Sequence, residues 1–288
     1  MRKTLKIIIP ILLTLVLVFA VTIITFKDIE KDLIIHFLDV GQADSILVEL
    51  PEKKTMLIDA GNNSDGNMIV QYLKERNIDT IDFLIGTHPH EDHIGGLDDL
   101  IDNFKIGKIY LPKVTHTTKT FEDVLLAIQR KGKKIRAAKA GVNIIYENEL
   151  KVYFLGPQER TYDELNHYSA VIKLDYLNNS FLFTGDAEII NEKEMLREYG
   201  SQLRADILKT GHHGSNSSTS QEFLAAVTPA YAVISVGKDN PYGHPSPEVI
   251  KRLNKANIKI FRTDLQGTII VQSNGTKISF DLEKNDLE

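Results

Sequence analysis

The 288-residue sequence contains no cysteine. Disulfide bonds and thiolate metal ligands are therefore excluded, and any metal ion must be held by histidine, aspartate or glutamate. The cysteine that a lipoprotein anchor needs is absent as well. The lack of thiols does not indicate a compartment, because such a chain is chemically safe in oxidising and reducing surroundings alike.

Low-complexity tracts and Pro/Gly-rich linkers are also missing. With 42% hydrophobic residues, the chain is long enough for a single sizeable core or for two lobes. We therefore predict an N-terminal segment, residues 1–26, followed by one folded domain, residues 27–288.

An excess of positive charge is the third absence. The formal net charge is −5, and it becomes −8 once the three basic residues of the N-terminal segment, Arg2, Lys3 and Lys6, are set aside. Proteins that grip duplex DNA over many phosphates are usually basic, so extensive nonspecific binding of duplex DNA is not indicated.

One stretch departs from this acidic balance. Two interpretations stay open for it: a solvated face of the protein, or a contact surface for an anionic polymer such as single-stranded DNA or teichoic acid. The basic residues of this stretch are Arg130, Lys131, Lys133, Lys134, Arg136 and Lys139.

The N-terminal segment is apolar enough to interact with a membrane. The run from Ile7 to Phe26 carries no charge and is about 20 residues long, the length of a membrane-spanning helix. A signal peptide has a shorter apolar region and a small-residue cleavage site, which this sequence does not offer convincingly. We predict an uncleaved single-pass anchor in the cell membrane, with its basic start in the cytoplasm and residues 27 onward outside; secretion is the alternative.

The segment 87–96, Thr-His-Pro-His-Glu-Asp-His-Ile-Gly-Gly, places four metal-ligand side chains within six positions. His88 and His90 point the same way on an extended backbone and can share one ion, while Asp92 and His93 reach the same cavity from a turn that we expect to open a helix at Ile94. Two such ions can activate a bridging water and clamp the oxygens of an in-line displacement. The alternative is a polar loop whose histidines cap a strand end.

Further strings follow this motif in a defined order, and together with it they resemble the metallo-β-lactamase superfamily and, within it, the extracytoplasmic hydrolase domain of the ComEC competence proteins. The resemblance covers residues 33–282 and implies an αββα sandwich, two facing mixed sheets flanked by helices. The strings are Phe-Leu-Asp-Val-Gly-Gln-Ala-Asp-Ser at 37–45, Leu-Ile-Asp-Ala-Gly at 57–61, Phe-Thr-Gly-Asp at 183–186, Gly-His-His-Gly-Ser at 211–215, Ser-Val-Gly at 235–237 and Tyr-Gly-His-Pro at 242–245.

The resemblance also implies a ligand set for two divalent ions, zinc or manganese. His88 and His90 are expected to hold one ion, Asp92 and His93 the other, with Asp186 bridging both. One histidine of the 211–215 string closes the second site, and we favour His213 narrowly over His212. The expected metal ligands are thus His88, His90, Asp92, His93, Asp186 and His213.

Other residues are expected to contact the substrate or to support the ligands. The catalytic set is Asp92, His212 and His244, the two histidines assisting the oxyanion or the leaving oxygen. Asn166 joins His212 and His244 in binding substrate. Asp59 is expected to accept a ring N–H from a liganding histidine, and Asp39, Gln42 and Asp44 either do similar work or make a hydrogen-bonded turn.

One position departs from the wider superfamily, which often has a further metal-binding histidine between the first motif and the bridging aspartate. The ComEC-like branch more often shows Asn-Asn-x-Ser there, and this chain has Asn-His-Tyr-Ser at 166–169. His167 is either a regained ligand or a polar side chain that enters a strand. His36 and His116 are expected to be structural or solvated.

Short apolar runs and helical spacings alternate along the domain. Helices are expected at 68–74, 121–131, 188–198, 221–227 and 247–255. Strands are expected at 34–37, 45–48, 55–59, 81–86, 152–155, 170–174, 181–183, 207–209, 232–236, 258–261 and 268–271.

Three classes of function fit these features. The first is a membrane-anchored, metal-dependent phosphodiesterase, a nuclease by its ComEC resemblance, whose substrate is DNA or an anionic cell-wall polymer. The second is another hydrolase, either a phosphorylcholine esterase of the cell wall or a β-lactamase-like amide hydrolase. The third is a non-catalytic binding module, against which the full ligand set argues. No protein partner is predicted, and DNA transport does not follow from the hydrolase domain alone.

Overall fold

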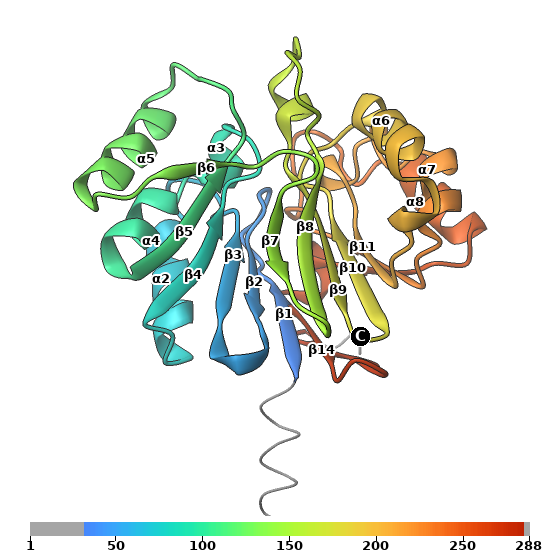
Figure 1. Cartoon of the computed structure of the whole chain (residues 1–288). Coiled ribbons are helices and arrows are strands. Elements are labelled where there is room, and N and C mark those ends of the chain that lie inside the picture. Colours follow the sequence, from blue (N-terminus) through green and yellow to red (C-terminus); the bar gives the residue numbers. More distant parts are fainter. Residues whose placement is uncertain (1–31, 285–288) are drawn as a thin grey trace, which may run out of the picture.

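The computed structural model describes residues 32–284, and the predicted membrane segment and its boundary at residue 26 lie outside this range. Within it, two β-sheets face each other and helices cover both outer surfaces (Figure 1). No helix in this part of the chain combines the length and the apolar character needed to cross a bilayer. The predicted αββα sandwich of two mixed sheets is confirmed.

The first sheet has eight strands, which run both parallel and antiparallel to their neighbours. Strands β3, β4, β5 and β6 are parallel to one another, so their carboxyl ends lie at the same edge. The order across the sheet is β15 (Ile278–Leu282), β14 (Ile269–Ser273), β1 (Leu33–Phe37), β2 (Ile46–Glu49), β3 (Thr55–Ile58), β4 (Thr80–Ile85), β5 (Lys105–Leu111) and β6 (Ile135–Ala137).

The second sheet has seven strands. Its strands β10, β11, β12 and β13 are parallel, and β7, β8 and β9 form an antiparallel ribbon beside them. The order is β13 (Lys259–Arg262), β12 (Tyr231–Ile234), β11 (Ile207–Lys209), β10 (Asn179–Phe183), β9 (Val171–Tyr176), β8 (Leu150–Gly156) and β7 (Asn143–Tyr146).

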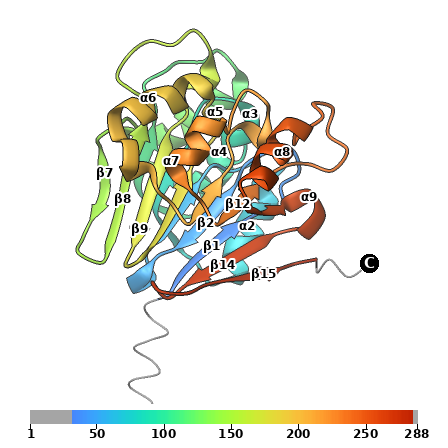
Figure 2. The same ribbon diagram turned by 90° about the vertical axis from the view of Figure 1, so that its right-hand side faces the viewer.

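Helices pack on the outer face of each sheet, as the two views show (Figures 1 and 2). The first sheet is covered by α2 (Gly66–Glu75), α4 (Leu97–Asn103) and α5 (Lys119–Arg130), and the second by α6 (Ile189–Tyr199), α7 (Gln221–Val227) and α8 (Pro247–Lys255). The remaining helical turns are α3 (Glu91–Ile94), α9 (Thr263–Gln266), η1 (Pro51–Lys53), η2 (Leu165–Tyr168), η3 (Gly200–Leu203) and η4 (His212–Gly214).

Three apolar layers result from the alternation of side chains along the strands. In β2, Ile46 and Val48 enter the core between the sheets, whereas Leu47 packs on the helical side. In α5, Phe121, Val124 and Ile128 face the sheet at helical spacing. Burial of these side chains removes apolar surface from water and holds the layers together.

The predicted start of the helix in the histidine motif is wrong. The turn after Pro89 begins a helix at Glu91 rather than at Ile94, so Asp92 and His93 lie within α3 and Ile94 ends it. The backbone of His90 is extended and serves as the N-cap, which lets the helix start directly after the histidine pair.

Candidate metal centre

The side chains of the predicted site meet at the carboxyl ends of the parallel strands. Asp59 follows β3 and the histidine motif follows β4, while Asp186 follows β10 and the His212–His213 pair follows β11. Because these strands belong to both sheets, the site lies where the two sheets meet at one end of the sandwich (Figure 1). Loops at the carboxyl ends of strands are the usual place for ligands in such folds.

The short helix α3 is held close to a neighbouring loop. A side chain at Gly95 would collide with the backbone of Asn62 and Asn63, so only glycine permits this approach. The amide of Gly95 also donates to the carbonyl of Gly61, at 2.9 Å. This packing fixes the helix that carries Asp92 and His93.

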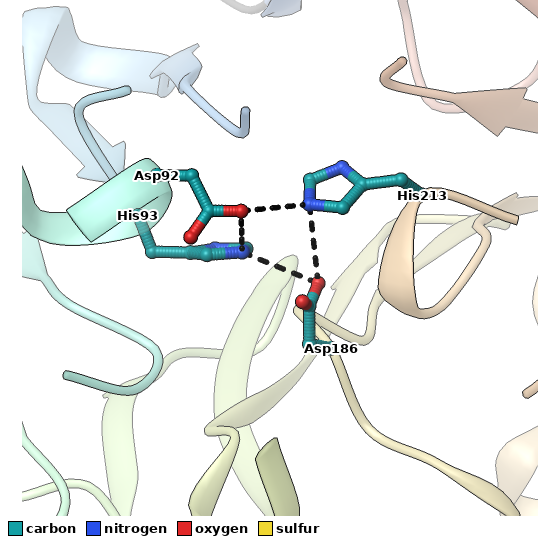
Figure 3. A group of neighbouring side chains, drawn as sticks. All are labelled: Asp92, His93, Asp186 and His213. Carbon is teal, nitrogen blue, oxygen red and sulfur yellow. Dashed lines mark hydrogen bonds and ion pairs between the residues drawn. The ribbon is translucent and has the colours of Figure 1, made fainter. Parts of the chain in front are cut away.

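Four side chains converge on one point (Figure 3). Nε2 of His93 lies 3.3 Å from Oδ1 of Asp186, and Nε2 of His213 lies 3.3 Å from Oδ2 of Asp92. The other two pairings, His93 with Asp92 and His213 with Asp186, are both 3.7 Å. One ligand-type atom from each residue thus lies within 4.8 Å of the others.

His88 lies against the other oxygen of the same carboxylate, and His90 lies beside His88. Nε2 of His88 is 3.0 Å from Nδ1 of His90 and 3.8 Å from Oδ2 of Asp186. The two carboxylate oxygens of Asp186 therefore face two different groups of histidines. The structure brings together all six residues that the sequence analysis named as ligands.

A divalent cation fits this donor set. Nε2 of His93 and Oδ1 of Asp186 are buried and have no hydrogen-bond partner within the described residues. Buried polar atoms are normally satisfied, so a pair of unpartnered lone-pair donors facing each other points to a bound ion. Nitrogen and carboxylate oxygen are ligands that zinc accepts, and imidazole with carboxylate also suits manganese.

Hydrogen bonds behind the site orient the ring nitrogens toward it. Nδ1 of His93 donates to Oδ2 of Asp59 at 2.8 Å, the predicted contact, and Nδ1 of His213 donates to the carbonyl of Ser235 at 3.0 Å. Thr87 fixes Asp59 in turn through its amide and its hydroxyl, both at 2.7 Å. Each bond leaves Nε2 free to face the centre.

Electrostatics favour charged carboxylates and neutral rings on the His88 side. Burial lowers the pKa of His88 well below its usual value and also lowers the pKa of His90. Burial acts to raise the pKa of Asp186, but the charges of His93 and His213 lower it well below its usual range. Ionised carboxylate and neutral imidazole are the forms that bind metal.

In the second group of ligands, the pKa values of the histidines His93 and His213 are raised rather than lowered. Burial acts to lower the pKa of His93, yet the carboxylates of Asp186, Asp92 and Asp59 raise it well above its usual value. For His213, burial acts in the same direction and is outweighed by Asp186 and Asp92. The two rings thus lie in a strongly negative surrounding, which attracts a cation.

A pocket of about 320 Å³ opens from this centre to the surface. Its walls are polar and include the predicted substrate contacts Asn166, His212 and His244 together with Asp186. The complete lining is Gln42, His90, Glu91, Asp92, Asn166, Asp186, His212, His213, Tyr242 and His244.

His212 is held by a carboxylate that the sequence analysis did not single out. Nδ1 of His212 donates to Oε1 of Glu188 at 3.0 Å, and Ser217 Oγ donates to the same oxygen at 2.8 Å. The hydrogen bond with His212 lowers the pKa of Glu188 to about 2. Both His212 and His213 have positive φ angles, 47° and 50°, a conformation that is uncommon for non-glycine residues.

His167 lies apart from the ligand group. It belongs to η2 rather than to a strand, and its Nε2 is 3.1 Å from Oε2 of Glu188. Glu188 therefore contacts His167 and His212 at once. The structure places His167 as a neighbour of His212 through this carboxylate.

The remaining candidates separate into near and far groups. Asp44 lies under the site, with its Oδ1 3.5 Å from Nδ1 of His213, and its other oxygen contacts the buried Lys209. Gln42 accepts the amide of Gly237 at 3.0 Å, whereas Asp39 contacts Gly41 and Lys284 away from the centre. His36 is buried and bonded to Tyr72 and Glu49, distant in sequence from the motif.

His116 and the basic stretch lie at the periphery. The ring centroid of His116 lies 6.3 Å from that of His90, and Nδ1 of His116 forms a hydrogen bond with the hydroxyl of Thr118. The stretch runs from the end of α5 along β6 and is largely exposed. Part of it is paired within the fold, since Arg130 contacts Asp102 and Lys139 contacts Glu159.

Three contributing residues escaped the sequence analysis. Glu188 and Lys209 sit in an expected helix and an expected strand, where their polar side chains carry no local signal of a distant partner. Tyr242 belongs to the quoted string at 242–245 but had no chemistry assigned to it. A lysine inside an otherwise apolar strand was the one available cue for Lys209.

Comparison with known proteins agrees with this geometry. The family model described as "Metallo-beta-lactamase superfamily" matches residues 38–238. ComE operon protein 3 of Bacillus subtilis (strain 168) is 31% identical over 252 residues, which are 82% of this chain and 32% of that protein. Competence protein ComA of Neisseria gonorrhoeae is 32% identical over 241 residues, 83% of this chain and 32% of its own length. The chain thus spans about a third of the length of these relatives.

Solved structures share the fold at low sequence identity. CmlA, a diiron beta-hydroxylase from Streptomyces venezuelae, aligns with a TM-score of 0.55 and 14% identity over 84% of this chain and 54% of that one. Zn(2+)-bound PqqB from Methylobacterium extorquens aligns with a TM-score of 0.50 and 11% identity over 79% and 97%. The chain belongs to the metallo-β-lactamase superfamily, as a metal-dependent hydrolase with competence proteins among its relatives.

Proposed function

We propose that this protein is a membrane-anchored, dinuclear-metal phosphodiesterase that cleaves DNA outside the cytoplasmic membrane. The observation that carries the proposal is the position of Asp186, whose two oxygens face two groups of histidines at the floor of a polar pocket. Competence proteins among the relatives favour DNA as the substrate.

In this proposal the six side chains divide between two ions, zinc or manganese. His88 and His90 would hold the first, and Asp92, His93 and His213 would hold the second, with Asp186 available to both. The contacts of His93 with Asp59 and of His213 with Ser235 support this division, because they direct Nε2 of each ring to the centre.

The ions would act as Lewis acids and as activators of water. Side chains of the protein position the groups that bind the phosphate and protonate the leaving oxygen. His212, held by Glu188, and His244, whose ring centroid is 5.7 Å from that of His212, line the pocket where a phosphodiester would enter. They are placed to donate hydrogen bonds to a phosphoryl oxygen and a proton to the leaving oxygen, and Asn166 offers its amide beside them.

The size of the pocket and the net charge of the chain favour single-stranded over duplex DNA as the substrate. A pocket of about 320 Å³ admits one diester group with its neighbours rather than a length of duplex. The formal net charge of −5 also disfavours a long electrostatic footprint. We therefore propose single-stranded DNA as the substrate and residues 1–26 as the anchor that holds the enzyme at the outer face of the membrane.

The test is hydrolysis by the full-length chain, loaded with manganese or zinc, of single-stranded DNA, double-stranded DNA and bis-p-nitrophenyl phosphate. We expect cleavage of single-stranded DNA that an Asp186→Asn substitution abolishes and that Asp102→Asn, an exposed carboxylate bonded to Arg130, leaves intact.

Other results would replace the proposal. Cleavage of the small diester alone would move the substrate to a cell-wall phosphodiester, such as a phosphorylcholine ester. Full activity of Asp186→Asn would contradict the ligand set. Inactivity of the metal-loaded chain on all three substrates would favour an amide hydrolase or a binding module.

A further inference from the structure

Tyr242 is an aromatic side chain at the mouth of the pocket that the proposed chemistry does not use. Its side chain lines the pocket, yet 70% of the residue is exposed to solvent. A tyrosine ring carries a large apolar surface, which the folded chain usually covers at least in part. A ring left open beside a substrate pocket therefore invites an explanation by function.

The loop that carries Tyr242 is fixed by other residues. The side-chain amide of Asn240 donates to the carbonyls of Gly237 and His244, at 2.9 and 2.6 Å. Its carbonyl oxygen accepts from the amides of Tyr242 and His244, at 3.2 and 3.0 Å. The loop thus holds its shape through Asn240, and the ring of Tyr242 is not what keeps it in place.

The ring of Tyr242 is the outermost of three neighbouring rings that lead away from the metal centre. His212 approaches Asp186, with 3.8 Å between Nε2 and Oδ2, and the ring centroid of His244 lies 5.7 Å from that of His212. The ring of Tyr242 comes next, 5.9 Å from His244 and only 22° from parallel with it. The series leads from the buried centre to an exposed flat surface.

We propose that Tyr242 is the stacking platform for a nucleobase, and so selects a nucleic acid strand over other phosphodiester polymers. A phosphodiester placed at His212 and Asp186 carries its attached nucleoside outward, past His244, to this ring. Stacking on an aromatic ring tolerates every base, so the platform itself imposes no sequence preference. A duplex keeps its bases stacked on each other, so the platform favours a single strand.

This inference rests on the proposed function, and its test separates the two. Binding of thymidine hexamers with phosphorothioate linkages to the metal-loaded full-length chain is measured by titration calorimetry, which needs no aromatic dye that would itself stack on the ring. A hexamer with the same linkages but without bases is the comparison. We expect the wild-type protein to bind the base-bearing strand about tenfold more tightly, the size of one base–aromatic stack.

Three variants locate the preference. Tyr242→Ala should bind both hexamers with the same affinity, and Tyr242→Phe should retain the preference because it keeps the ring. Tyr146→Ala is the matched control, since Tyr146 is also 70% exposed but lies on β7 and does not line the pocket. It should behave as the wild type does.

Binding and cleavage together separate the platform from the nuclease. If the wild type binds the two hexamers equally, the platform is overturned. Equal binding is expected for a site that contacts only a sugar–phosphate or polyol–phosphate chain. Preference retained by Tyr242→Ala would overturn it as well. A base preference that depends on Tyr242, without any cleavage of DNA, would support the platform and reject the nuclease. Cleavage of DNA without a base preference in binding would support the nuclease and reject the platform.

Discussion

Asp59 influences the candidate metal centre through His93. It accepts the ring N–H of His93 at 2.8 Å and two bonds from Thr87, so it fixes the tautomer and the direction of His93. An Asp59→Asn substitution keeps the shape but presents an amide in place of the carboxylate. We expect affinity for manganese or zinc to fall about 10- to 100-fold, the usual loss when such a support is removed.

Competition with a chelating dye measures this loss. Asp82→Asn is the control, because Asp82 bonds the amide and hydroxyl of Thr55 and lies away from the centre. Unchanged metal affinity in Asp59→Asn would mean that His93 needs no support.

Lys209 and Asp44 form a buried ion pair beneath the ligands. Lys209 is fully buried, contacts Oδ2 of Asp44 and lies 3.3 Å from the carbonyl of Gly185. A Lys209→Met substitution leaves the buried carboxylate of Asp44 without its ammonium partner, so we expect the free energy of unfolding to drop by about 3–5 kcal/mol. Chemical denaturation monitored by circular dichroism gives the value.

A double variant tests the reason for that drop. In Lys209→Met combined with Asp44→Asn no lone charge remains, and part of the lost stability should return. Additive losses in the two single variants would show that the pair does not act as a unit.

The residues that meet at the centre could be predicted, and so could the support that Asp59 gives to His93, whereas the contact of Glu188 with His212 could not. The spacing of His88, His90, Asp92 and His93 is itself a metal-binding pattern, and ordered strings named Asp186 and His213. The bond between Glu188 and His212 joins segments whose approach depends on the whole fold. Nothing local in either segment predicts it.

The short helix α3 connects fold and site at the scale of one element. Because Gly95 approaches the backbone of Asn62 and Asn63, a methyl group there must push α3 away. We expect Gly95→Ala to destabilise the fold by about 1–3 kcal/mol, as overpacking does, and to weaken metal binding by displacing Asp92 and His93.

Gly132→Ala separates these two effects. Gly132 has a positive φ of 61° with open space around it, so alanine there strains the backbone without pushing α3. Stability should fall in this control, measured by thermal unfolding, while metal affinity is kept. Wild-type metal affinity in Gly95→Ala would show that α3 adjusts freely.

Most elements followed from periodicity, and the exceptions have physical reasons. The bounds of α7 and α8 match their predicted ranges because apolar spacing and N-caps agree at Ser220 and Ser246. The strands β5, β6, β7 and β15 were not predicted, since lysines, glycine and exposed positions interrupt their patterns. In β5 the neighbouring strands compensate for that weak local preference.

A partly buried phenol makes the stability of the whole molecule sensitive to alkali. Burial raises the pKa of Tyr72 to about 12, and its hydroxyl is 3.0 Å from Nδ1 of His36. A group whose pKa is raised on folding contributes stability that is fully present below its unfolded pKa, 10.0, and is lost as the pH rises through about 12. We expect the free energy of unfolding to fall across that interval.

Tyr72→Phe should make this fall less steep, because one phenol no longer ionises on unfolding. Denaturation at a series of pH values tests the slope, and tyrosinate absorbance is easy to follow because the sequence has no tryptophan. Tyr146→Phe removes an exposed phenol and serves as the control. Identical slopes for the wild type and Tyr72→Phe would contradict the prediction.

The position of the centre between the two sheets has a consequence for folding. His93 belongs to the first sheet's connections and Asp186 and His213 to those of the second, so an ion that binds all three is a cross-link between segments distant in the chain. Such a ligand binds the folded chain and not the unfolded one, and it shifts the folding equilibrium by mass action. The midpoint of thermal unfolding therefore becomes a readout of metal occupancy that requires no knowledge of the substrate.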